Sequence, residues 1–93
     1  MNPKYSVIIP VYNVAPYLSE CLDSLCSQSV VSWEAVCVDD GSVDGSGMLL
    51  DKYAEKDDRV KVIHQRNQGV SAARNAGIAA ATGEWLYFLR LRA

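Results

Sequence analysis

Two adjacent carboxylates and a tyrosine ring are the side chains of this sequence whose types and positions best fit a ligand site. Asp39 and Asp40 follow the apolar run Trp33–Val38, and Tyr12 follows the apolar run Tyr5–Val11. A tyrosine ring packs well against a flat nucleobase, and an aspartate accepts a hydrogen bond from a ring N–H group. The combination predicts a nucleoside site. The alternative is that the two aspartates only form a turn.

The glycine-rich loops that commonly hold phosphate groups are absent. The segment after the first apolar run, Pro10 to Pro16, contains no glycine, which excludes the G-x-G-x-x-G pattern there. The chain also has no G-x-x-x-x-G-K-[ST] pattern. Any phosphate bound by this chain must therefore be held by other local groups or by a metal.

The elements that must position these residues alternate between strand and helix patterns. Short β-branched runs predict strands, and apolar residues at helical spacing predict amphipathic helices. The predicted strands are Tyr5–Val11, Trp33–Val38, Arg59–His64 and Trp85–Leu89, and the predicted helices are Ala15–Ser27, a segment carrying Met48, Leu49, Tyr53 and Ala54, and Val70–Ala81. This βαβαβαβ order predicts an α/β fold with an open, mostly parallel, Rossmann-like sheet.

In such a sheet a ligand binds beyond the carboxyl ends of the strands. Those ends carry Tyr12-Asn13, the Asp39 to Ser42 turn, Gln65 to Gln68, and Arg90 to Arg92. The two tryptophans, Trp33 and Trp85, stand at strand starts, so we expect both to pack against the sheet rather than bind a ligand. We expect His64 to be a strand-end residue without a catalytic role.

Composition narrows the class of protein. The 93 residues are 49% apolar and 22% charged, with a formal net charge of −2, which is ordinary for one small globular domain and does not favour a nucleic-acid partner. No apolar run approaches the roughly 18 residues of a membrane-spanning helix. The three cysteines include no C-x-x-C pair and are expected to be buried thiols in a reducing compartment. We therefore expect a cytoplasmic location.

Four segments, in order, resemble successive motifs of family 2 glycosyltransferases, which have the GT-A fold. They are V-I-I-P-V-Y-N at Val7–Asn13, V-D-D-G-S-V-D-G at Val38–Gly45, N-Q-G-V-S-A-A-R-N-A-G at Asn67–Gly77, and G-E-W-L-Y-F-L at Gly83–Leu89. The resemblance implies the N-terminal, nucleotide-binding half of an inverting enzyme that transfers a sugar from a nucleotide donor, commonly linked to uridine diphosphate (UDP), to an acceptor hydroxyl. A non-catalytic nucleotide-binding module and a structural fragment are the alternatives.

The resemblance also implies roles for individual residues. Tyr12 would pack against the base, Asp40 would accept its imide N–H, and Asp39 would lie close to the nucleoside. An arginine on an alanine-rich helix, such as Arg74, is more often a solvated or ion-paired side chain than a ligand contact. The candidate nucleotide-binding set is Pro10, Tyr12, Asp39, Asp40, Asn67, Arg74 and Asn75. No catalytic residue is assigned.

The sequence departs from the family after the fourth predicted strand. Members of the family usually carry D-x-D or a close variant there, whose carboxylates hold Mg²⁺ or Mn²⁺, whereas this chain has Phe88-Leu89-Arg90-Leu91-Arg92-Ala93. Arginine cannot ligate a metal, so the expected Mg or Mn has no ligands at these positions. Arg90 and Arg92 could clamp a diphosphate instead, although a non-native tail is the favoured interpretation.

This departure suggests a single, truncated nucleotide-sugar-binding domain over residues 1–93 that transfers no sugar alone. Truncation would leave an apolar strand edge uncovered. We therefore expect a homo-oligomer formed through about Val70 to Leu89, with Leu86 and Phe88 at the contact, or by exchange of a terminal element.

Overall fold

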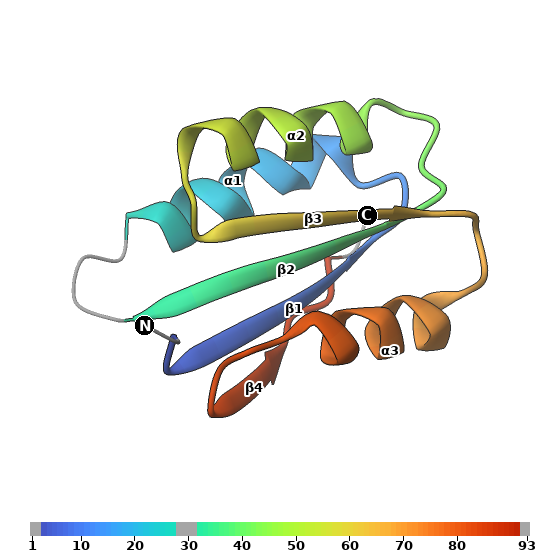
Figure 1. The fold of residues 1–93 in the computed structure, drawn as a ribbon. Helices are drawn as coiled ribbons and strands as arrows, with labels where there is room; N and C mark the ends of the chain where they lie inside the picture. The colour runs from blue at the N-terminus through green and yellow to red at the C-terminus, as the bar shows by residue number, and fades with distance from the viewer. Residues whose placement is uncertain (1–2, 28–31, 92–93) are drawn as a thin grey trace.

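In the part of the chain that the structure describes, seven elements alternate between strand and helix (Figure 1). The computed structural model describes residues 3–27 and 32–91. The strands are β1 (Tyr5–Val11), β2 (Trp33–Asp40), β3 (Val60–Gln65) and β4 (Trp85–Phe88), and the helices are α1 (Ala15–Cys26), α2 (Ser46–Lys56) and α3 (Val70–Ala80). The four strands form one parallel sheet in the order β3-β2-β1-β4. The predicted α/β fold class is confirmed.

The helices cover the sheet on both faces. Helices α1 and α2 lie on one face and α3 on the other, so that β2 is buried along its whole length (Figure 1). Strand β4 forms one edge, and α3 lies over β1 and β2 rather than over β4. All four residues of β4 are consequently exposed.

Two apolar clusters fill the space between sheet and helices. Beneath α1 and α2, Ile9 and Val11 pack with Leu18, Leu22 and Leu50, and all five are fully buried. On the other face Ile8, Val36 and Val38 pack with Ala73 of α3.

Helix α3 lies unusually close to β1. A Cβ atom added at Gly77 would lie 2.5 Å from Cγ2 of Ile8, so this position on the helix has no room for a side chain. The small residues on the buried side of α3, Ala73 and Gly77, therefore permit its close packing on the sheet.

Most predicted element ends differ from the observed ones by at most one residue. The predicted end of β2 at Val38 was wrong by two residues, and the two are the candidate site residues Asp39 and Asp40. Asp39 and Asp40 belong to the strand rather than to the following turn. Asp39 pairs with Val11 and His64, and Asp40 pairs with Gln65. Because β2 has a neighbour on both sides, the ladder continues through the two aspartates, and the turn begins at Gly41.

Two further expectations need correction. Trp33 is buried, and the Arg59 guanidinium lies over its ring at 4.1 Å from the ring centre, but Trp85 is 59% exposed because none of the described helices covers the edge strand. All three cysteines are free thiols, yet only Cys37 is fully buried, while Cys21 and Cys26 are half-buried at the side of α1. In the described residues, no helix has the length and apolar character needed to span a membrane.

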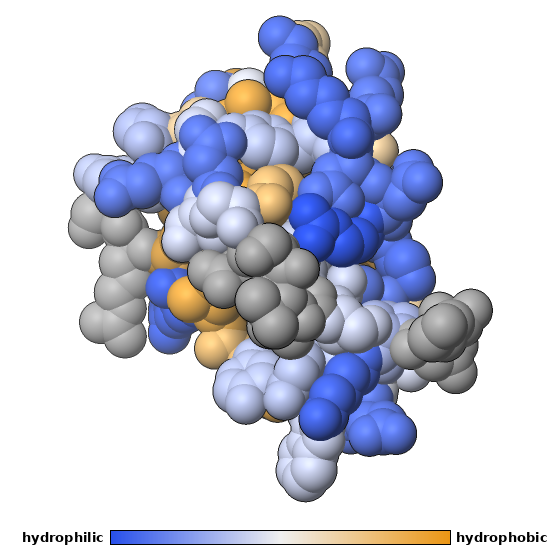
Figure 2. Space-filling view, turned by 90° about the vertical axis from the view of Figure 1, so that its left-hand side faces the viewer, coloured by the Kyte–Doolittle hydropathy of each residue, from blue (hydrophilic) through white to orange (hydrophobic). Residues whose placement is uncertain are grey.

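The end of the sheet where β1 and β2 begin carries mostly polar side chains, with small apolar areas between them (Figure 2). A buried carboxylate, Glu34, organises this end. Its Oε2 accepts hydrogen bonds from Ser6 Oγ at 2.5 Å and from the Thr82 N–H at 2.7 Å, and its Oε1 accepts one from Lys61 Nζ at 2.5 Å. Ser6 Oγ in turn accepts the Gly83 N–H at 2.8 Å. The network ties the α3–β4 turn to β1 and β2.

The same network fixes the charge of Glu34. Burial alone would raise the pKa of Glu34, but the hydrogen bonds from Lys61, Ser6 and Thr82 outweigh burial and lower the pKa to about 2. The ionised carboxylate is therefore the form that stabilises the fold.

We predict that Glu34→Gln lowers the free energy of unfolding at pH 7 by roughly 1.5–3 kcal/mol, because the buried donors lose an ionised acceptor. The folded-state pKa is depressed, so this contribution is present above the ordinary pKa of about 4.5 and disappears as the pH falls towards 2. Denaturant unfolding between pH 7 and pH 3 measures the difference. Glu55→Gln, on the exposed side of α2, is the control and should change stability by less than about 0.5 kcal/mol. Equal stability of the two variants at pH 7 would contradict this interpretation.

Candidate functional site

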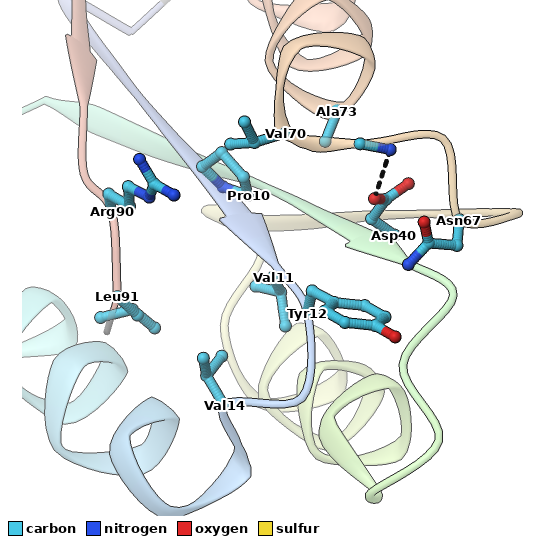
Figure 3. A pocket seen from close by; sticks show the side chains of 11 residues that line it. Pro10, Val11, Tyr12, Val14, Asp40, Asn67, Val70, Ala73, Arg90 and Leu91 are labelled. Atoms are coloured by element: carbon cyan, nitrogen blue, oxygen red, sulfur yellow. Dashed lines mark hydrogen bonds between the residues drawn. The ribbon is translucent and has the colours of Figure 1, made fainter. Parts of the chain in front are cut away.

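A pocket with a volume of about 320 Å³ lies at the carboxyl ends of β1 and β2 (Figure 3). Its lining comes from the end of β1, the end of β2, the β3–α3 loop, the first turns of α3 and the residues that follow β4. Four of the predicted site residues line it together, namely Pro10, Tyr12, Asp40 and Asn67. The volume falls in the range of small-molecule sites.

The pocket opens beside Pro10 because the pairing of β1 with β4 ends early. The Ile8 carbonyl accepts the Leu89 N–H at 3.0 Å, so alternate residues of β1 direct their backbone groups toward β4. The ladder between these strands ends at Ile8 and Phe88. Pro10, two residues further on, has no N–H to offer, so its place beyond the ladder costs no hydrogen bond.

Asp40 anchors one wall of the pocket. The residue is 4% exposed, and its Oδ1 accepts hydrogen bonds from Gln65 Nε2 and the Gln68 N–H, both at 2.9 Å. Its Oδ2 accepts the Gly69 N–H at 3.0 Å, the bond drawn in Figure 3. Burial would raise the pKa of Asp40, but these hydrogen bonds outweigh it and lower the pKa. The carboxylate is therefore ionised at neutral pH and holds the β3–α3 loop against the end of β2.

Gly41 allows the β3–α3 loop to lie close to the end of β2. It has a φ of +76°, and a Cβ atom there would lie 2.7 Å from the backbone nitrogen of Asn67. A larger residue would strain the turn and push Asn67 away from the pocket.

The position of Tyr12 is set by hydrogen bonds between the turn after β1 and the turn after β2. Its side chain is 51% exposed and lies beside Asp40 and Asn67 in Figure 3. The next residue, Asn13, has a φ of +51°, and its Oδ1 accepts the Val43 N–H at 2.9 Å. The Asn13 N–H donates to Ser42 Oγ at 3.1 Å. The turn after β1 is thus fixed to the turn after β2.

Asp39 supports these turns from the opposite face of the sheet. Its Oδ1 accepts the Ser42 N–H at 2.9 Å, and its Oδ2 lies 2.9 Å from His64 Nδ1. His64 Nε2 lies 2.8 Å from Asp51 Oδ1 of α2. Both ring nitrogens face carboxylate oxygens, and only the protonated imidazole can donate from both. The hydrogen bonds to Asp51 and Asp39 accordingly raise the pKa of His64 above its ordinary value.

The remaining predicted residues are not brought to the pocket lining. Arg74 and Asn75 are exposed on α3, and the Arg74 guanidinium lies 5.8 Å from the centre of the Phe88 ring. Asp39 lies behind the lining rather than in it.

Sequence reasoning missed other residues of the site. Gln65 was expected at this edge of the sheet but not as a hydrogen-bond donor to Asp40, although the two residues pair in the parallel register, and Gly69 was not assigned a role. Arg90, which sequence reasoning had weighed only as an alternative, lines the pocket.

Comparison with known proteins relates this arrangement to one family. The sequence model described as "Glycosyl transferase family 2" matches residues 6–89. The uncharacterized glycosyltransferase EpsJ of Bacillus subtilis (strain 168) is 47% identical over 89 residues, which are 96% of this chain and 26% of that protein.

Solved structures give the same result. The chain resembles S. aureus TarS 1-349 in complex with UDP-GlcNAc, with a TM-score of 0.82, 35% identity, and coverage of 94% of this chain and 26% of that chain. It also resembles the mannosyltransferase PcManGT from Pyrobaculum calidifontis in complex with GDP-Man and Mn²⁺, with a TM-score of 0.79, 31% identity, and coverage of 90% and 26%. The chain spans about a quarter of the length of these relatives.

Proposed function

The chain belongs to glycosyl transferase family 2, and from this premise we propose that the pocket at the carboxyl ends of β1 and β2 binds the nucleotide of a sugar donor. The observation that carries the proposal is the half-exposed Tyr12 ring beside the buried, ionised Asp40 carboxylate. The ring offers a flat surface for a base, and the carboxylate offers an acceptor for a ring N–H.

Uridine diphosphate is the donor nucleotide that we propose. Asp40 Oδ2 accepts one hydrogen bond, from Gly69, and so retains capacity for a second, which the imide N–H of uracil can supply. TarS, which resembles this chain with 35% identity, was solved with UDP-GlcNAc. The relative solved with GDP-Man has a slightly lower TM-score, and it makes a guanosine nucleotide the competing ligand to test.

The other predicted residues keep supporting roles in this proposal. Asp39, held by His64 and the Ser42 N–H, steadies the two turns that present Tyr12. Asn67 and Pro10 line the pocket and would flank a bound base. Arg74 and Asn75 face solvent on α3, from which they can meet the parts of a donor that extend beyond the pocket.

The proposed reaction of the family protein is an inverting transfer. The acceptor hydroxyl attacks the anomeric carbon, a carboxylate base takes the hydroxyl proton, and the diphosphate leaves with the electrons of the broken bond. In residues 3–27 and 32–91 the pocket lining contains one carboxylate, Asp40, and its hydrogen bonds suit it to binding rather than to proton transfer.

The three free thiols fit the cytoplasmic location that we retain in this proposal.

We predict that the 93-residue chain binds donor nucleotide but transfers no sugar, because no base is placed at the described pocket. Incubation with UDP-linked sugars, followed by chromatographic detection of released UDP, measures this. Release of UDP above the rate without protein would contradict the prediction.

The nucleoside assignment rests on two side chains. We predict that Asp40→Ala weakens UDP binding by roughly 1.5–3 kcal/mol, the range for a hydrogen bond to a charged group, and that Tyr12→Ala also weakens it. Isothermal titration measures both. Tyr17→Ala, which removes a tyrosine of similar exposure from α1, is the control and should bind like the parent chain.

Asp40 also holds the β3–α3 loop, so a second variant separates the two roles. Asp40→Asn keeps an oxygen acceptor at the same place but lacks the charge, and its melting temperature reports whether the loop is still in position. An Asp40→Asn variant that melts like the parent chain but binds UDP more weakly assigns the loss to the nucleotide contact. Unchanged UDP affinity in both Tyr12→Ala and Asp40→Ala would exclude this pocket as the nucleoside site.

We further propose that the chain self-associates through β4. Leu86 and Phe88 are 41% and 51% exposed, and their backbone groups face away from β1 because Trp85 and Leu89 donate to it. The strand therefore presents an edge that a second copy can pair with in antiparallel fashion.

We predict a dimer or larger species at micromolar concentration by light scattering, and a monomer for Leu86→Lys, which places a charge at the contact. Met48→Lys introduces the same charge at an exposed apolar residue of α2, and this control variant should associate like the parent chain. A monomeric parent chain would contradict the proposed contact.

A further inference from the structure

Two charged side chains line the pocket in the described part of the chain, Asp40 on one side and Arg90 on the other. Figure 3 shows the Arg90 side chain directed toward Pro10, across the pocket from Asp40 and Asn67. The Leu89 N–H donates to the Ile8 carbonyl at 3.0 Å, which fixes the backbone immediately before Arg90. The pocket thus has an acceptor at one end and a permanent cation at the other.

The residues present do not fit the divalent cation that the family resemblance leads one to expect. A hard cation such as Mn²⁺ needs several oxygen ligands. The one carboxylate in the lining, Asp40, is already engaged by three N–H donors. Across the described residues, no group of three or more His, Cys, Asp or Glu side chains is placed to hold a metal. Arg90 would also repel a cation bound next to it.

The chemistry of Arg90 suits the ligand that such a cation would otherwise hold. The guanidinium group is always charged and presents several N–H donors in a planar fork, which matches the oxygens of a phosphate. The Tyr12 and Asp40 side of the pocket is the nucleoside end of the proposed site, so a bound nucleotide can extend its phosphates toward Arg90.

We propose that Arg90 binds the diphosphate of the nucleotide directly and that this chain therefore binds UDP without a divalent cation. This inference rests on the proposed nucleotide site and assigns its phosphate end. It predicts that each phosphate adds affinity and that the added affinity depends on Arg90.

Titration with uridine, UMP and UDP in the presence of EDTA tests the proposal. We expect UDP to bind at least about tenfold more tightly than uridine in EDTA, and Mn²⁺ to change this by less than about twofold. Arg90→Ala should reduce the affinity for UDP to that for uridine and leave uridine binding unchanged. Arg90→Lys, which keeps the charge without the fork, should lose part of the gain.

Arg66→Ala is the matched control, since it removes the same charge from the β3–α3 loop at the same edge of the sheet but outside the pocket lining. It should retain at least half of the parent's affinity for UDP.

The outcomes separate the two proposals. If the parent chain binds uridine but gains nothing from the phosphates in EDTA, or if Arg90→Ala binds UDP like the parent, the role of Arg90 is wrong while the nucleoside site stands. If UDP binds more tightly than uridine only when Mn²⁺ is present, the role of Arg90 is also wrong, and the nucleoside site again stands. If uridine itself does not bind, the proposed nucleotide site fails.

Discussion

The hydrogen bonds that Asp40 accepts at the end of β2 are the constraint on which the candidate site depends. They join the carboxyl end of the central strand to the loop that begins α3, through Gln65, Gln68 and Gly69. Buried N–H groups need acceptors, and an ionised carboxylate provides stronger ones than a neutral group does. The same oxygens that could receive a ligand therefore keep the pocket wall in place.

A second buried carboxylate does comparable work at the other end of the same strand. Glu34 gathers donors from Ser6, Lys61 and Thr82, and so fixes the turn that leads into β4. Strand β2 thus carries an ionised anchor at each end, and each anchor holds one of the two connections of α3. This arrangement places α3 firmly on β1, where Gly77 permits close packing, while β4 is joined to the sheet along one edge only.

The sequence alone was sufficient for the order of elements, because apolar periodicity and turn residues specify strands and helices locally. It also placed Pro10, Tyr12, Asp40 and Asn67 at one edge, since the ends of parallel strands meet there. It misassigned the end of β2, because the pairing of Asp39 with Val11 and His64, and of Asp40 with Gln65, overrode the turn propensity of aspartate. The exposure of Trp85 and the contacts of His64 could not be predicted, because they depend on how α3 and α2 sit over the sheet.

In the proposed site, the nucleoside binds between the end of β1 and the Asp40 carboxylate. Amide chemical shifts of the isotopically labelled chain, recorded during titration with uridine, test it most directly. We expect concentration-dependent shifts for the N–H groups of Tyr12, Gln68 and Gly69, with those of Thr82 and Gly83 unchanged at the opposite end of the sheet. Shifts confined to that opposite end, or no shifts at saturating uridine, would contradict the claim.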